Sequence, residues 1–166
     1  MQVCWRPELI PGLCLLVRQG SAPRSLETMA TTYVLVISCG RAVVAQVGAL
    51  GTVALAPGWY LYVGSARRHL AARLARHQRR QKRRHWQIDY LLLEAAVALT
   101  AIWVTAAWGE CDLARSLLAL PQVSVPHPRL GASDCRCPAH FCRWQDSLPA
   151  LIQTLRALGL SRYPPP

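Results

Sequence analysis

Between residues 31 and 64, short apolar runs alternate with turns that contain glycine or proline. Residues 32–38 and 59–63 are rich in β-branched and aromatic side chains, and residues 42–47 and 52–55 are shorter apolar runs between them. Runs of this length, bounded by turn residues, are typical of antiparallel strands. The pattern therefore predicts a compact antiparallel meander in which residues 32–38 and 42–47 form a hairpin.

Beyond residue 65, the spacing of the apolar residues becomes helical. Leu70, Leu74 and His77 lie three or four positions apart, which predicts a helix over residues 69–80. The remaining pattern predicts helices over residues 86–96, 110–120 and 147–158, a strand over residues 99–105, a polar Cys-rich segment over residues 131–142, and a frayed tail from residue 163. We therefore expect an α+β fold, with a small antiparallel β-sheet flanked by helices.

One part of this pattern, residues 90–109, also has the length of a membrane span. It carries a single charge, Glu94, and arginines precede it. Its uninterrupted apolar part is only residues 95–108, which include Thr100 and Thr105. A buried helix end followed by a buried strand explains the stretch equally well. We prefer this second interpretation and keep a membrane-associated protein as an alternative.

The N-terminal 28 residues differ in texture from the rest of the chain. The whole chain has two methionines, Met1 and Met29, and the regular apolar pattern begins directly after Met29. We therefore expect residues 1–28 to be a disordered extension or the product of a mis-assigned start. Residues 9–17 are apolar, as in a signal peptide, but Pro11 interrupts them and no clear cleavage motif follows.

The positive charge of the chain is concentrated in one segment. The 166 residues have a net charge of +11, of which nine cations lie in residues 67–84 with no acidic residue among them. With 52% hydrophobic residues the chain is not a disordered basic tail, and the charge indicates a polyanionic partner, either nucleic acid or an anionic membrane surface. Apart from Arg73, which is considered below, we expect the cations of this basic segment to bind DNA: Arg67, Arg68, Arg76, Arg79, Arg80, Lys82, Arg83 and Arg84.

The seven cysteines include a cluster near the C-terminus, where three thiols and one imidazole fall within residues 135–142. The odd total argues against a closed disulfide framework and favours a reducing compartment, so we expect a cytoplasmic protein. Cys111, Cys135, Cys137 and His140 have the donor types of a structural Zn²⁺ site. Buried free cysteines are the alternative interpretation.

Several motifs together resemble the GIY-YIG nuclease superfamily. Thr31, Thr32 and Tyr33 stand at the place of the first motif, and Tyr62, Val63 and Gly64 match a variant of the second. Arg73 follows Gly64 by nine residues, His77 lies one helical turn later, and Glu110 opens a segment that is similar to the metal-binding helix of the family. Residues 62–66, 85–92 and 133–140 resemble a small branch of the superfamily that also occurs fused to endonuclease III-like DNA glycosylases.

This resemblance implies a GIY-YIG-like nuclease domain over residues 29–145, followed by a C-terminal helix and Pro-rich tail over residues 146–166. It implies a metal-dependent DNA endonuclease that hydrolyses phosphodiester bonds, with a role in DNA repair and with Mg²⁺ or Mn²⁺ as cofactor. The implied catalytic residues are Tyr33, Tyr62, Arg73, His77 and Glu110, of which Glu110 would hold the metal. Because 28 residues separate the two tyrosines, more than is usual in the family, we expect an inserted pair of strands.

These side chains also suit phosphodiester hydrolysis on chemical grounds. Arg73 can bind two phosphate oxygens, and Glu110 can hold one Mg²⁺ ion. Tyr33 and Tyr62 can position or deprotonate a water molecule, with His77 as base or relay. Each also has a simpler structural explanation: packing for the aromatic rings, a solvated helix face for the arginine, and a favourable helix terminus for the glutamate.

Other assignments remain open from the sequence. Asp89 and Glu94 are rival carboxylates because both lie nearer the basic segment than Glu110 does, although Asp89 can equally cap a helix or pair with Arg84. The alternative function, from a different class, is a nucleic-acid-binding module that keeps the fold and lacks catalysis.

Overall fold

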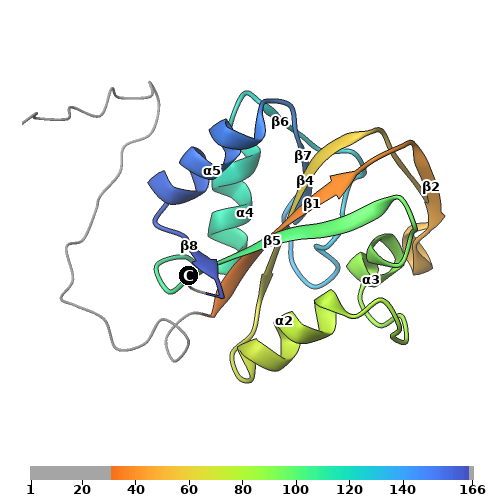
Figure 1. Ribbon diagram of the computed structural model, residues 1–166, viewed down its shortest axis with the longest axis horizontal. Coiled ribbons are helices and arrows are strands. Elements are labelled where there is room, and N and C mark those ends of the chain that lie inside the picture. Colours follow the sequence, from red (N-terminus) through yellow and green to blue (C-terminus); the bar gives the residue numbers. More distant parts are fainter. Residues whose placement is uncertain (1–30, 165–166) are drawn as a thin grey trace, which may run out of the picture.

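The computed structural model describes residues 31–164, and our expectations for residues 1–28 lie outside this range. Six strands form one antiparallel sheet in the order β6-β7-β4-β1-β5-β8 (Figure 1). These are β1 (Thr32–Cys39), β4 (Gly58–Ser65), β5 (Val97–Thr105), β6 (Val123–Ser124), β7 (Phe141–Trp144) and β8 (Ser161–Tyr163). The helices of this part of the chain are α2 (Leu70–Gln78), α3 (Gln87–Leu92), α4 (Glu110–Leu118) and α5 (Leu148–Ala157). The α+β class and the small antiparallel sheet flanked by helices are confirmed.

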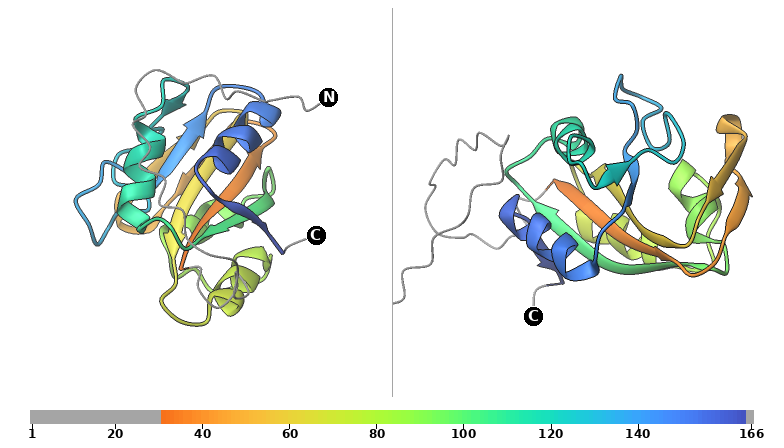
Figure 2. Two further views of the ribbon diagram at one scale, coloured as in Figure 1. Left: turned by 90° about the vertical axis from the view of Figure 1, so that its left-hand side faces the viewer. Right: turned by 90° about the horizontal axis from the view of Figure 1, so that it is seen from above.

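Helices cover both faces of the sheet, α2 and α3 on one side and α4 and α5 on the other (Figures 1 and 2). Along β1, Tyr33 and Leu35 belong to the core that contains α2 and α3, whereas Val34 and Val36 belong to the core that contains α4 and α5. A strand buried on both faces needs apolar residues at every position, which explains the continuous apolar run at residues 32–37.

The predicted pairing of the first strands is wrong. Strand β1 pairs with β4 and β5, whereas β2 (Val43–Gln46) and β3 (Thr52–Leu55) pair only with each other in a separate two-stranded sheet. The eight-residue β1 is buried on both faces and is matched by the long strands β4 and β5, while the four-residue β2 alternates buried and exposed positions. This β2–β3 hairpin is a pair of strands between Tyr33 and Tyr62, where the sequence analysis expected one.

All four predicted helices are shorter than the sequence suggested, and α3 differs most. Helix α2 ends at Gln78, and α3 ends at Leu92 because residues 93–96 turn into strand β5. The stretch at residues 90–109 is therefore a helix end followed by a strand, as the preferred interpretation held. Within residues 31–164, no helix combines the length and the apolar composition that crossing a bilayer requires.

The C-terminal segment is part of the domain core. Leu151 and Leu155 of α5 are fully buried against the sheet. Beyond α5, Ser161–Tyr163 adds an edge strand, in which Tyr163 pairs with Ile102 of β5. The expectation of a frayed tail from residue 163 is wrong for Tyr163, because the edge of β5 is available there for strand pairing.

Candidate functional site

A cavity of about 240 Å³ lies where the end of β4, helix α2 and the start of α4 meet. It brings together three of the five predicted catalytic residues, Tyr62, Arg73 and Glu110. The remaining lining side chains come from the end of β4, the start of α3 and the loop before β7: Ser65, His85, Trp86, Gln87, Gly131, Ser133 and Asp134. Residues more than 70 positions apart in the sequence thus share one small polar hollow.

Arg73 is held in this cavity by an aromatic ring and has no acidic partner within residues 31–164. The centre of its guanidinium lies 4.3 Å from the centroid of the Trp86 ring, a cation–π contact. Its Nε is buried and has no hydrogen-bond partner in the described part of the chain. A half-buried arginine that lines the cavity and keeps a buried, unused donor is suited to bind an anion that enters the cavity.

Glu110 is the first residue of α4, and its carboxylate faces the same cavity. The hydroxyl of Ser65 donates a hydrogen bond to one carboxylate oxygen, and His140 Nδ1 lies 2.9 Å from the other. Although burial alone would raise the pKa of Glu110, the hydrogen bonds from His140 and Ser65 lower it below its usual value. The group is therefore an ionised carboxylate at neutral pH.

Tyr33 and His77, the other two predicted catalytic residues, form a buried pair behind the cavity. The Tyr33 hydroxyl lies 2.8 Å from His77 Nε2, and neither residue lines the cavity. Burial, with a further contribution from the charge of Lys82, lowers the pKa of His77 to about 3. His77 is then neutral, and the tautomer decides whether its Nε2 accepts a hydrogen bond from the Tyr33 hydroxyl or donates one to it.

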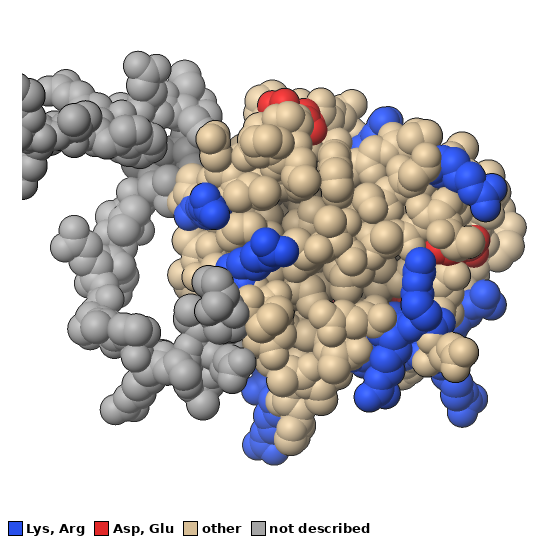
Figure 3. Space-filling view, in the orientation of Figure 1, with Lys and Arg blue, Asp and Glu red and all other residues tan. Residues whose placement is uncertain are grey.

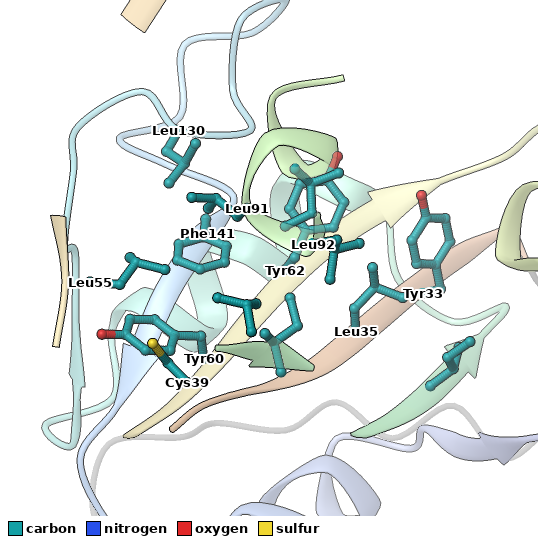
Figure 4. Packing of buried hydrophobic residues seen from close by; sticks show 14 of the residues in the cluster. Tyr33, Leu35, Cys39, Leu55, Tyr60, Tyr62, Leu91, Leu92, Leu130 and Phe141 are labelled. Atoms are coloured by element: carbon teal, nitrogen blue, oxygen red, sulfur yellow. The ribbon is translucent and has the colours of Figure 1, made fainter. Parts of the chain in front are cut away.

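The glycine that follows Tyr62 and Val63 is required by this arrangement. Tyr33 lies directly opposite Gly64 in the β1–β4 ladder, and a Cβ at Gly64 would stand 2.5 Å from the Tyr33 ring. Figure 4 shows Tyr33 and Tyr62 on adjacent strands with their hydroxyl groups pointing the same way, and both rings belong to the core that contains α2 and α3. A side chain at position 64 would push Tyr33 out of this position.

Both tyrosines are fully protonated at neutral pH. Burial raises the pKa of Tyr33 to about 12, despite the opposing charge of Arg73, and burial raises the pKa of Tyr62 further above its usual value. A phenol in this state donates hydrogen bonds and is a poor base. Tyr62 can therefore orient a water molecule or a phosphate oxygen in the cavity without removing a proton itself.

Asp89, the rival carboxylate, has a structural role: it joins α2 to the start of α3. It is fully buried, pairs with Arg76 at 2.9 Å and with Lys82 at 3.2 Å, and accepts the backbone N–H groups of His85 and Trp86. Burial would raise its pKa, but the hydrogen bonds, first that from Arg76, lower it to about 2. Asp89 therefore caps α3, which is one of the two structural roles considered from the sequence. Its ion-pair partners are Arg76 and Lys82, not Arg84.

The cations of the basic segment divide into those whose side chains have a hydrogen-bond or ion-pair partner within the protein and those whose side chains have none among residues 31–164. Arg76 and Lys82 pair with Asp89, and Arg80 donates to the carbonyl oxygens of Leu92 and Val97. Arg80 is exposed as a residue even though its guanidinium makes these bonds. The other exposed arginines of the segment, whose side chains make no hydrogen bond or ion pair within residues 31–164, are Arg67, Arg68, Arg79, Arg83 and Arg84. In Figure 3, lysine and arginine side chains gather along the lower edge of the molecule, where Figure 1 places α2 and the segment after it. The surface available to an anion is thus smaller than the sequence indicated.

The predicted metal ligands Cys111, Cys135, Cys137 and His140 come together in space. Their ligand atoms all lie within 4.8 Å of one another, so the cluster could hold a metal ion such as zinc. Burial and the neighbouring thiols of Cys137 and Cys135 raise the pKa of Cys111 to about 12. Tetrahedral Zn²⁺ with bonds of about 2.3 Å to sulfur requires ligands roughly 3.8 Å apart, and Cys135 Sγ and His140 Nε2 already lie 3.5 Å apart.

The sequence predicts no role for several cavity residues, although they lie in segments that resemble the GIY-YIG branch described above. Ser65 follows the Tyr62 motif, and Trp86 lies in the segment at residues 85–92. Their contribution depends on contacts to Glu110 and Arg73, which are 45 and 13 positions away in the chain. Spacing along the sequence gives no signal for contacts of this kind.

Comparison with known proteins identifies the family. The model of the family described as "Domain of unknown function DUF123" matches residues 32–159, so the chain belongs to that family. No curated protein and no solved structure matches the chain. The matched range includes every residue of the candidate cavity and of the Cys–His cluster.

Proposed function

We propose that this protein is a metal-dependent DNA endonuclease of the GIY-YIG type, acting in DNA repair, with the cavity at Arg73 and Glu110 as its active site. The observation that carries the proposal is the convergence of Tyr62, Arg73 and Glu110 on one hollow of about 240 Å³. A phosphodiester needs a cation for its charge and a positioned water molecule. One guanidinium, one ionised carboxylate and one phenol meet these needs.

In this proposal the scissile phosphate enters beside Arg73. The guanidinium, held against Trp86, binds phosphate oxygens and stabilises the charge that develops on them. The protonated Tyr62 hydroxyl orients the attacking water. The buried Tyr33–His77 pair lies behind these groups, so its proposed role is to keep β1, β4 and α2 in register at the cavity instead of to touch DNA.

Glu110 is the proposed holder of the divalent metal. The cavity offers two carboxylates, those of Glu110 and Asp134, and hard oxygen donors of this kind suit Mg²⁺ or Mn²⁺. Each Glu110 oxygen accepts one hydrogen bond, which leaves a lone pair on each for an ion. A bound ion would supply charge neutralisation and a more acidic water molecule.

The exposed arginines of the basic segment are the proposed DNA contacts. Arg67 and Arg68 lie between the end of β4 and α2, so they adjoin the cavity in sequence, and Arg79, Arg83 and Arg84 follow α2. These cations would bind the phosphate backbone without reading sequence. They would bring the duplex to the cavity.

The alternative is a nucleic-acid-binding module without catalysis. One observation favours it: both Glu110 oxygens are already engaged by Ser65 and His140. Such a module would bind DNA through the same arginines and leave it intact. Incubation of supercoiled plasmid, branched DNA and damaged duplexes with the protein separates the two functions, because only a nuclease nicks DNA in Mg²⁺ or Mn²⁺ and stops when EDTA is added.

We also propose that Cys111, Cys135, Cys137 and His140 bind one structural Zn²⁺ ion. Three thiols and one imidazole match the donor preference of zinc, and a fully protein-derived set of four is typical of structural sites. Metal analysis of protein purified without chelators should find one zinc per chain. Protein that is folded and free of zinc would contradict this assignment.

A further inference from the structure

His140 lies between the Cys–His cluster and the candidate active site, and its two ring nitrogens face different partners. Its Nε2 is 3.5 Å from the Sγ of Cys135, within the cluster. Its Nδ1 is 2.9 Å from a carboxylate oxygen of Glu110, which lines the cavity. The His140 side chain is 1% exposed, so solvent does not compete for either nitrogen.

The loop that carries the cluster also builds one wall of the cavity. Ser133 and Asp134 line the cavity and directly precede Cys135. Gly131 donates its N–H to Gln87 at 2.6 Å, and a Cβ on Gly131 would stand 2.9 Å from the Tyr62 ring. An ion that fixes this loop would therefore also fix the position of the cavity wall.

The geometry points to a zinc ion that positions Glu110 through His140: the cluster binds Zn²⁺, His140 ligates it through Nε2, and its Nδ1–H donates to Glu110. Metal-bound histidines generally donate their second nitrogen to a carboxylate, and this partner fixes the ring and strengthens the ligand. Glu110 would thus belong both to the outer shell of the zinc site and to the proposed nuclease site. The inference rests on the proposed function for the catalytic role of Glu110, but the contact itself can be measured without catalysis.

The test is the zinc affinity of full-length protein, measured by competition with a chromophoric chelator. Loss of an outer-shell carboxylate typically lowers metal affinity by about 10- to 100-fold. We expect this loss for Glu110→Ala and a smaller one for Glu110→Gln, whose amide oxygen still accepts the bond. The matched control is Asp112→Ala, on the same helix, because Asp112 is exposed and its one ion pair within residues 31–164 is with Arg115. Its zinc affinity should equal that of the wild type.

Co²⁺ in place of zinc gives a second measurement. Wild type, Glu110→Ala and Asp112→Ala should share the absorption bands of a tetrahedral site with three thiolates, because Glu110 is not itself a ligand. Equal zinc affinity of Glu110→Ala and wild type would overturn the inference, and so would a wild type that binds no zinc. A zinc affinity that falls as expected in a protein that cleaves no DNA would support the contact and refute only the nuclease.

Discussion

His77 illustrates how one buried side chain links the fold to pH. Its pKa is about 3 in the folded protein, against 6.5 for an exposed imidazole, because burial and the charge of Lys82 disfavour its cationic form. As the pH falls below 6.5, the unfolded chain takes up a proton that the folded chain does not. The free energy of unfolding should therefore decrease by up to about 1.4 kcal/mol per pH unit between pH 6 and pH 5.

Urea unfolding at pH 7, 6 and 5 measures this loss, and His77→Gln is the matched variant. Glutamine can still form a hydrogen bond with Tyr33 but does not titrate, so the decrease should become shallower. The carboxyl groups with lowered pKa values, Asp89 and Glu110, titrate below this window and affect both proteins equally. Equal slopes for the two proteins would show that His77 titrates normally in the folded state.

The basic segment would be a source of repulsion if Asp89 did not hold it to α3. A single buried carboxylate accepts hydrogen bonds from Arg76 and from the two backbone N–H groups before α3, and it pairs with Lys82. Removal of one partner from a buried ion pair leaves the other charges uncompensated. The connection between α2 and α3 therefore depends on this residue.

We expect Asp89→Asn to lower the free energy of unfolding by about 3 kcal/mol or more. The control is Asp112→Asn, which breaks an ion pair whose side chains are 62% and 68% exposed, and which should cost less than about 0.5 kcal/mol. Denaturant unfolding of both variants measures the difference. Comparable losses would mean that the Asp89 network contributes no more than a surface pair.

Helices and strands were predictable from the sequence where the residue pattern that indicates them lies within the element itself. The apolar run at residues 32–38 and the helical spacing of Leu70, Leu74 and His77 gave β1 and α2 within two residues at each end. The pairing of β1 was not predictable in this way, because the choice between β2, β4 and β5 depends on burial of both faces of β1. That burial becomes visible only when α2, α3, α4 and α5 are in place.

The same distinction holds for the candidate site. The resemblance groups five residues, of which Tyr62, Arg73 and Glu110 line one cavity while Tyr33 and His77 do not. Donor type groups the four Cys–His residues, and these do meet in space. The contacts between the groups were missed, since His140 and Glu110 are 30 positions apart and belong to separate motifs. Equally, the charge of residues 67–84 gives no indication that Arg76, Arg80 and Lys82 make ion pairs or hydrogen bonds with other parts of the protein.

At the scale of the whole molecule, the net charge of +11 would act on the proposed DNA partner mainly through cations that remain exposed. If roughly five arginines contact phosphates, the slope of log K against log salt should be near −4. Arg83→Ala should make the slope shallower by about 1. Arg80→Ala should change it less, because the Arg80 guanidinium is exposed but already donates to the Leu92 and Val97 carbonyls.

Fluorescence anisotropy with a labelled duplex between 50 and 200 mM salt measures these slopes. An affinity that does not change with salt would exclude binding through phosphate contacts. If the Arg80 and Arg83 substitutions change the slope equally, the hydrogen bonds of Arg80 to backbone carbonyls do not reduce its contribution to DNA binding.

The most direct test of the account is plasmid nicking by wild type, Arg73→Ala and Arg79→Ala in Mg²⁺ or Mn²⁺. Arg73 belongs to α2 and lines the cavity. Arg79 directly follows α2, is exposed and does not line the cavity. We predict that wild type nicks DNA, that Arg73→Ala is about 100-fold slower or worse, and that Arg79→Ala retains the wild-type rate within a few-fold at saturating protein. No nicking by the wild type, or equal rates for wild type and Arg73→Ala, would contradict the proposed active site.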